Sequence, residues 1–216
     1  PLAEGGAAAP PADQAHYLRN VLRLEEGASV LAFNESDGEY AARIETLTKK
    51  ECALRVAEKR RASEPGPDLW LIVAAVKRAA LETIVQKATE LGVSKIIPAA
   101  TARANTARLN IQRLQSIAVE ASEQCWRISV PRIAELAPLA DILAGWPRSR
   151  RLLFCDEAGD EPAAEWGGRV GRAAPVLDVL RGAGKGPWAI LIGPEGGFAP
   201  DERASLRALP YVTAAT

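Results

Sequence analysis

The sequence predicts two successive folding units: a small β-barrel or curled sheet, followed by an α/β domain with a mostly parallel sheet. Two observations support this prediction. Residues 29–58 contain short runs in which apolar and polar side chains alternate, whereas from residue 69 onward apolar runs alternate with helical periodicity. The chain has 216 residues, 48% apolar and 25% charged, which is typical of a folded chain with one large or two small domains.

The first unit is expected to begin with a helix over residues 13–23 and to continue as a β-meander. Its three strands are expected at residues 29–34, 39–46 and 51–58. Residues 60–67 contain two prolines and a glycine, which interrupt both helices and strand pairing, so this segment is predicted to be a linker. We therefore place a domain boundary after residue 65, which gives domains 1–65 and 66–216.

The second unit begins with a β-α-β pattern. Residues 69–76 form a continuous apolar run, as expected for a strand buried on both faces of a parallel sheet. The following helix is predicted from apolar residues at three- and four-residue spacing, namely Leu81, Ile84, Val85, Ala88 and Leu91. Gly92 is predicted to cap its C-terminus, and residues 95–100 to form the next strand.

The remaining elements continue this alternation. A helix from residue 109 to about 126 is expected to bury Ile111, Leu114, Ile117, Ala118, Ala121 and Cys125. Further strands are expected at residues 128–133, 151–156 and 188–192. Further helices are expected near residues 139–144, 175–181 and 201–208. Residues 157–174 are rich in Gly and charge and are predicted to be an irregular connection.

Composition excludes several classes of protein. The 27 basic residues equal the 27 acidic ones, which argues against a strongly basic nucleic-acid wrapper, although residues 66–150 carry 11 basic and 7 acidic side chains. Five arginines gather within that basic segment: Arg103, Arg108, Arg113, Arg127 and Arg132. They predict either a phosphate-binding surface or a solvated helix face.

The sequence also bears on location and on metal binding. No apolar run is long enough to span a bilayer and no signal peptide is present, so we expect a cytoplasmic protein with no membrane partner. Three scattered cysteines and a single histidine, His16, predict neither a disulfide framework nor a metal site. Because the chain has no Met, even at position 1, we expect it to be part of a longer protein.

The sharpest local feature is the segment Gly193-Pro194-Glu195-Gly196-Gly197, which follows an apolar strand and precedes a helix. Ligands bind beyond the carboxyl ends of parallel strands, and glycines allow close approach to the backbone. Glu195 disfavours a phosphate there, so the loop predicts a neutral or cationic ligand; a tight turn with no ligand is the alternative. The glycine-rich residues 182–186 lack the Ser or Thr of a phosphate loop and predict a surface turn.

Several ordered motifs resemble those of the ribosomal RNA small-subunit methyltransferase E family. They are residues 16–24, Lys77-Arg78, residues 90–93, residues 101–103, Glu120-Ala121, residues 123–125, Arg127 and residues 191–198. The resemblance implies a SPOUT-type trefoil-knotted, mostly parallel sheet with helices on both faces, preceded by a PUA-like β-barrel. It also implies methyl transfer from S-adenosylmethionine to N3 of one uridine in the 16S rRNA of the 30S subunit, by a homodimer.

The resemblance also implies site residues. Cofactor-binding residues would be Phe154, Cys155, Ile192, Gly193, Pro194, Glu195, Gly196 and Gly197. The catalytic candidates would be Arg103 or Arg127, as the guanidinium beside the uracil anion, and Gln124 as a partner of the base edge. RNA-binding candidates would be Arg19, Arg23, Arg108 and Arg113. From its own position in the loop, Glu195 is expected to brace the loop by accepting backbone amide bonds, with proton transfer as the alternative.

The chain departs from the family pattern in three places. Trp126 stands where the family more often has a small residue, so the helix end before Arg127 is expected to differ locally. The usual first strand, with an Arg and an aromatic residue, is absent, and so is the Leu-Gly-Pro-Arg motif that would follow residues 211–213, so the knot-threading segment is expected to be missing. A SPOUT methyltransferase acting on another RNA position and a non-catalytic RNA-binding protein remain alternatives.

Overall fold

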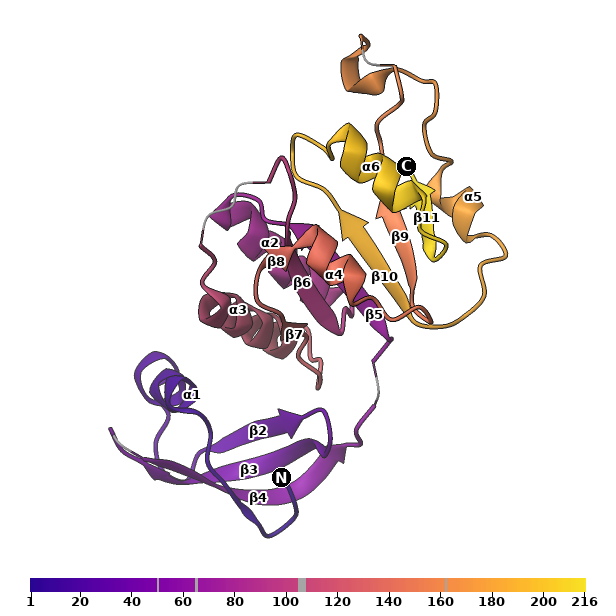
Figure 1. The fold of residues 1–216 in the computed structure, drawn as a ribbon. Coiled ribbons are helices and arrows are strands. Elements are labelled where there is room, and N and C mark those ends of the chain that lie inside the picture. The colour runs from indigo at the N-terminus through magenta and orange to yellow at the C-terminus, as the bar shows by residue number, and fades with distance from the viewer. Residues whose placement is uncertain (50, 65, 105–107, 162) are drawn as a thin grey trace. The chain divides into compact units, whose positions relative to one another are not determined.

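A computed structural model describes residues 1–49, 51–64, 66–104, 108–161 and 163–216 (Figure 1). The chain folds as two units. One contains residues 1–65 together with residues 126–129, and the other contains residues 66–125 and 130–216. Nothing in the sequence indicated that the short segment 126–129 packs with the first unit. No helix within the described ranges has the length and apolarity required to cross a membrane.

The first unit is built on an antiparallel sheet with the strand order β1-β4-β3-β2. Its strands are β1 (Ala7–Ala8), β2 (Ser29–Asn34), β3 (Gly38–Leu47) and β4 (Cys52–Arg61). Between β1 and β2 the chain forms α1 (Ala12–His16), which continues directly into a π-helical turn, η1 (Tyr17–Val21). Alternate residues of β3 and β4, including Ile44 and Leu54, form the core, as the period of two predicts. β4 extends through Arg60 and Arg61, so these two residues belong to the sheet and not to the predicted linker.

The second unit contains a sheet in which every strand pairing is parallel, in the order β11-β9-β10-β5-β6-β7, with β8 also paired to β6. Its strands are β5 (Leu69–Ala74), β6 (Lys95–Ala100), β7 (Arg132–Ile133), β8 (Ala137–Pro138), β9 (Arg151–Cys155), β10 (Trp188–Ile192) and β11 (Val212–Ala215). Its helices are α2 (Arg78–Glu90), α3 (Ile111–Gln124), α4 (Leu139–Ala144), the 3₁₀ turn η2 (Glu165–Gly167), α5 (Val176–Leu180) and α6 (Pro200–Arg207).

Helices cover both faces of this sheet, as Figure 1 shows, and the central strand β5 explains why. Leu71 and Val73 point to one face, where they pack with residues of α2 and α3, whereas Ile72 points to the other face and packs with residues of α4 and α6. Both faces of β5 are therefore shielded from solvent, which accounts for its continuous apolar sequence. The predicted α/β class with a parallel sheet is confirmed; the trefoil knot stays a prediction.

Some predicted elements are wrong in detail. The strand expected at residues 128–133 is reduced to Arg132–Ile133, because Trp126 adopts a left-handed backbone conformation (φ 61°) that redirects the chain. Leu91 was expected on the buried face of α2, but it lies beyond the last helical residue as the C-cap and is 80% exposed. Cys125 is exposed for the same reason, since α3 ends at Gln124. Gly92, with φ 98°, has the predicted capping conformation.

Candidate active site

A surface hollow lies at the carboxyl ends of β9 and β10, two neighbouring parallel strands. One wall comes from the residues after β9 and the other from the loop after β10. The lining residues are Cys155, Asp156, Glu157, Ala158, Ile192, Gly193, Pro194, Gly197 and Phe198. This is the edge at which open α/β sheets bind ligands, and it contains the loop that the sequence singled out.

Two glycines shape the loop after β10. A Cβ atom on Gly193 would lie only 2.5 Å from the ring of Phe198, which is buried and packs edge-on against Phe154 with ring centroids 4.9 Å apart. Gly193 therefore makes room for an aromatic pair beneath the hollow. Gly197 has φ 66°, the left-handed region that glycine adopts without strain.

Arg103 and Glu202 tie the loop after β6 to the loop after β10. The Nη1 of Arg103 donates to the carbonyl oxygen of Gly196 at 2.9 Å. The carboxylate of Glu202 accepts from the amide of Ala102 at 2.8 Å and from the amide of Ala199 at 3.0 Å, so it also caps the start of α6. β6 and β10 flank β5 on opposite sides, and these bonds therefore close one end of the sheet across its central strand.

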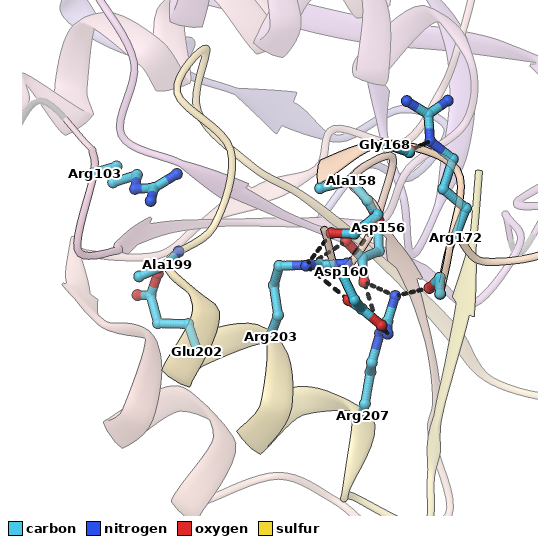
Figure 2. A network of polar contacts seen from close by, with 12 residues as sticks. Arg103, Asp156, Ala158, Asp160, Gly168, Arg172, Ala199, Glu202, Arg203 and Arg207 are labelled. Carbon is cyan, nitrogen blue, oxygen red and sulfur yellow. Dashed lines mark hydrogen bonds and ion pairs between the residues drawn. The ribbon is translucent and has the colours of Figure 1, made fainter. Parts of the chain in front are cut away.

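The wall after β9 is held by buried charge (Figure 2). The carboxylate of Asp156 is buried and accepts from the Nε of Arg203 and the Nε of Arg207, each at 2.8 Å. Arg203 also donates to the carbonyl oxygens of Ala158 and Gly159, at 2.6 and 2.9 Å. Two arginines of α6 thus fix the first residues of the 157–172 loop through charge-assisted hydrogen bonds.

The same pair of arginines reaches further into this loop. Both form ion pairs with Asp160, at 3.1 Å from Arg203 and 3.2 Å from Arg207. Arg207 also donates to the carbonyl oxygen of Gly171 at 2.9 Å. The segment that looks irregular in sequence is therefore a hydrogen-bonded structure anchored on one helix.

The electrostatics of the hollow suit a neutral or cationic ligand. Burial raises the pKa of the Cys155 thiol, and the nearby Glu157 carboxylate raises it further, so the thiol stays neutral at neutral pH. Most other lining groups are apolar or backbone, and Glu157 is an exposed anion. Outside this lining, at the end of β6, the buried hydroxyl of Thr101 has no hydrogen-bond partner within the described chain.

Most predicted cofactor residues lie at this hollow. Those that line it are Cys155, Ile192, Gly193, Pro194 and Gly197. Phe154 lies in the core beneath, and Gly196 is the partner of Arg103. The expectation for Glu195 is wrong: its side chain is exposed and accepts no hydrogen bond in the described part of the structure, and Glu202 accepts the loop amide instead.

The predicted catalytic residues come from different elements and divide between the two units. Arg103 lies against the loop after β10, and Gln124 is the exposed last residue of α3. Arg127 belongs to the segment that packs with the first unit, and its Nη2 donates to the Oγ of Ser129 at 2.9 Å. The predicted RNA-binding arginines divide between the units, with Arg19 and Arg23 in the first and Arg108 and Arg113 in the second.

Sequence analysis did not identify Arg203, Arg207 or Glu202 as residues that hold the site in place. A signal was present, because two arginines spaced four apart lie on one face of a helix that follows directly after a ligand loop. Their shared partner, Asp156, could not be found from the sequence, since it lies 47 residues before Arg203 and 51 before Arg207. No group of His, Cys, Asp and Glu side chains suited to a metal ion occurs in the ranges that the structure describes.

The fold and the site define a ligand-binding α/β domain joined to a small β unit, and both parts match families of RNA methyltransferases. Residues 63–214 match an RNA methyltransferase domain, and residues 10–57 match an RNA methyltransferase PUA domain.

Two relatives show to which family of RNA methyltransferases the chain belongs. The chain is 30% identical over 187 residues to the ribosomal RNA small subunit methyltransferase E of Rickettsia conorii, covering 87% of this chain and 71% of that protein. It is 26% identical over 198 residues to the protein of that name from Bacillus subtilis, covering 88% and 74%. The chain therefore belongs to the ribosomal RNA small subunit methyltransferase E family.

The fold also matches a solved structure. The ribosomal RNA small subunit methyltransferase E from Neisseria gonorrhoeae, bound to S-adenosyl methionine, superimposes with a TM-score of 0.78 at 22% identity, covering 100% of this chain and 85% of that one. At this identity the match establishes the architecture of the chain.

Proposed function

We propose that this protein methylates N3 of a uridine in the 16S rRNA of the small ribosomal subunit, with S-adenosylmethionine as the methyl donor. The observation that supports this function best is the hollow at the ends of β9 and β10, in a chain whose two parts match RNA methyltransferase families. Its lining suits a ligand whose reactive centre is a sulfonium cation, because it combines backbone groups and apolar side chains with an exposed carboxylate.

The residues present fit such a cofactor. We assign its binding to residues 192–197 on one side of the hollow and to residues 155–158 on the other, with Phe154 and Phe198 supporting the floor. When bound, S-adenosylmethionine supplies the electrophilic methyl group. The chain contributes orientation, and the two braced loops keep the walls of the pocket in place before the ligand arrives.

Arg103 is our first candidate for the chemistry at the base. Uracil N3 carries a proton at neutral pH, so it becomes a nucleophile only when that proton leaves and the negative charge spreads over O2 and O4. A guanidinium has five N–H donors, and Arg103 uses one of them on Gly196. The remaining donors can stabilise the uracil anion next to the cofactor loop.

The other predicted residues complete the proposal. We assign Arg127 and Gln124 to the phosphate and the base edge of the target nucleotide, and Arg19, Arg23, Arg108 and Arg113 to the surrounding RNA backbone. In this proposal the unit built on residues 1–65 binds RNA, residues 66–216 perform the transfer, and the enzyme acts as a homodimer in the cytoplasm.

The test is methyl transfer from radiolabelled S-adenosylmethionine to purified 30S subunits, followed by mass spectrometry of the modified nucleotide. We expect one methyl group per 16S rRNA, on N3 of a uridine. Arg103→Ala should lower kcat by about 100-fold, the usual loss for one charge-stabilising donor. It should weaken cofactor binding by a smaller factor, because the bond that braces Gly196 is lost as well. Arg181→Ala, which removes an exposed arginine of a surface ion pair, is the matched control and should be fully active.

Two results would contradict the proposal. Wild-type rates for Arg103→Ala would remove that residue from the chemistry. A methyl group on another RNA position, or no transfer despite cofactor binding, would replace the proposed reaction with methylation of a different target or with simple RNA binding.

A further inference from the structure

We propose that Trp126 is a stacking platform for an unpaired base of the RNA substrate. This inference rests on the proposed function, because it assumes an RNA substrate, and it adds a binding site on the first unit. Neither the sequence motifs nor the cofactor site includes this residue.

The conformation of Trp126 is unfavourable for the fold. Its φ is 61°, in the left-handed region that costs free energy for every residue with a Cβ and that glycine adopts freely. Its side chain is 67% exposed, so burial of the indole does not offset this strain. Glycine would satisfy the backbone better and would lose little packing, which indicates that the indole serves a purpose other than stability.

The backbone at Trp126 is held in place by Arg61, which forms an ion pair with Glu39. The Nη1 of Arg61 donates to the carbonyl oxygen of Trp126 at 2.8 Å. The Nε and Nη2 of the same arginine donate to the carboxylate of Glu39 at 3.1 and 2.9 Å, and Glu39 is only 5% exposed. Because Arg61 ends β4 and Glu39 lies in β3, the backbone that carries the exposed indole is tied to the sheet of the first unit. A backbone that is already held in place loses little entropy when the ring binds a ligand.

The local charge favours RNA as the occupant. Within the first unit, Arg127 follows the tryptophan directly, Arg61 donates to its carbonyl oxygen, and residues 126–129 contain no acidic side chain. An exposed aromatic ring beside arginines matches how proteins bind single-stranded RNA, with a base on the ring and arginines near the phosphates. Bases inside a duplex are stacked on their neighbours and cannot reach such a ring, so the ligand is an unpaired nucleotide.

A second tryptophan, Trp166, shares the exposure and the backbone conformation of Trp126 but differs in the charge around it. Trp166 also has a left-handed backbone (φ 52°) and is 50% exposed. Its loop, residues 157–172, contains two arginines but four carboxylates: Glu157, Asp160, Glu161 and Glu165. Arg203 and Arg207 of α6 neutralise Asp160 together with Asp156, and the three other carboxylates of the loop still outnumber its two arginines. This remaining negative balance repels phosphates, so exposure and strain at Trp166 do not predict RNA binding.

The experiment measures the affinity of full-length variants for purified 30S subunits and for a fluorescent single-stranded oligoribonucleotide. Trp126→Gly should raise Kd for both probes by about tenfold, the loss expected for one stacked base, while its melting temperature rises because the backbone strain is relieved. Trp126→Phe keeps a stacking ring and should bind within about threefold of wild type. Trp166→Gly should gain thermal stability in the same way and bind RNA like wild type.

Three results would overturn the inference. The first is wild-type RNA affinity for Trp126→Gly, and the second is equal weakening by Trp126→Phe and Trp126→Gly. The third is dissociation of a dimer by Trp126→Gly in sedimentation experiments without a change in RNA affinity, which would make the tryptophan an interface between copies. S-adenosylmethionine binding and methyl transfer by the wild-type protein, measured in parallel, show separately whether the proposed function itself fails.

Discussion

Two loops border the same hollow, and the structure holds them by different means. The loop after β10 is short and is kept in shape by glycines, one aromatic pair and hydrogen bonds from Arg103 and to Glu202. The loop after β9 is long and is anchored by Arg203 and Arg207 to the buried carboxylate of Asp156 and to Asp160. Packing and partly exposed hydrogen bonds therefore maintain one wall, and buried charge maintains the other. Both depend on α6, because Glu202 faces one loop while the two arginines face the other.

The largest expected effect comes from removing the buried carboxylate. Asp156→Ala should lower the free energy of unfolding by about 3 kcal/mol, because it leaves two arginines without their shared partner, and Arg203 is 11% exposed. The loss should be at the low end of the usual range, since Arg203 keeps Asp160 and two carbonyl oxygens. Urea denaturation measures it, and cofactor affinity should fall with it.

The control is an exposed ion pair in the same unit. Asp178→Ala removes the partner of Arg181 in a pair whose side chains are largely exposed, and should cost about 0.5 kcal/mol, with normal cofactor binding. Equal losses for Asp156→Ala and Asp178→Ala would mean that the Asp156 network does not brace the wall.

The packed wall should respond to a single methyl group. Gly193→Ala places a Cβ against the ring of Phe198, which cannot move freely because it is buried against Phe154. Overpacking of this kind costs about 1 to 3 kcal/mol, and thermal denaturation should show the loss together with weaker cofactor binding.

Gly196→Ala is the matched control in the same loop. Its new Cβ would lie 3.7 Å from the side chain of Arg103, an ordinary contact, so stability should change by less than about 0.5 kcal/mol. If both variants lost the same stability, the aromatic pair would not determine the shape of the loop.

The contrast between the walls also explains what the sequence could predict. Lys95–Ala100 and Leu139–Ala144 have the predicted bounds, because apolar periodicity is a local property. The ligand loop was also predicted, since its glycines follow a buried strand. The wall after β9 could not be predicted in the same way, because Asp156 and its arginines lie 47 and 51 residues apart.

Two further differences between the sequence-based predictions and the structure also arise from polar contacts. Glu195 is part of the loop in sequence, yet it is Glu202 that accepts the hydrogen bond from the amide of Ala199. This occurs because Glu202 lies in the first turn of α6, which faces the loop. The segment 126–129 packs with the first unit although it follows a helix of the second, an arrangement set by Arg61 from 65 residues earlier in the chain. Hydrophobic pattern carries no information about such long-range polar contacts.

The most direct test of the account is cofactor protection of a single thiol. Cys155 lines the hollow, whereas Cys125 is exposed next to the end of α3. Alkylation with N-ethylmaleimide, followed by mass spectrometry, reports each thiol separately. Without cofactor, Cys155 should react slowly, and its rate should keep rising at alkaline pH, because its raised pKa delays formation of the thiolate. S-adenosylmethionine should slow the reaction of Cys155 further and leave Cys125 unchanged; equal rates for Cys155 with and without the cofactor would contradict the site.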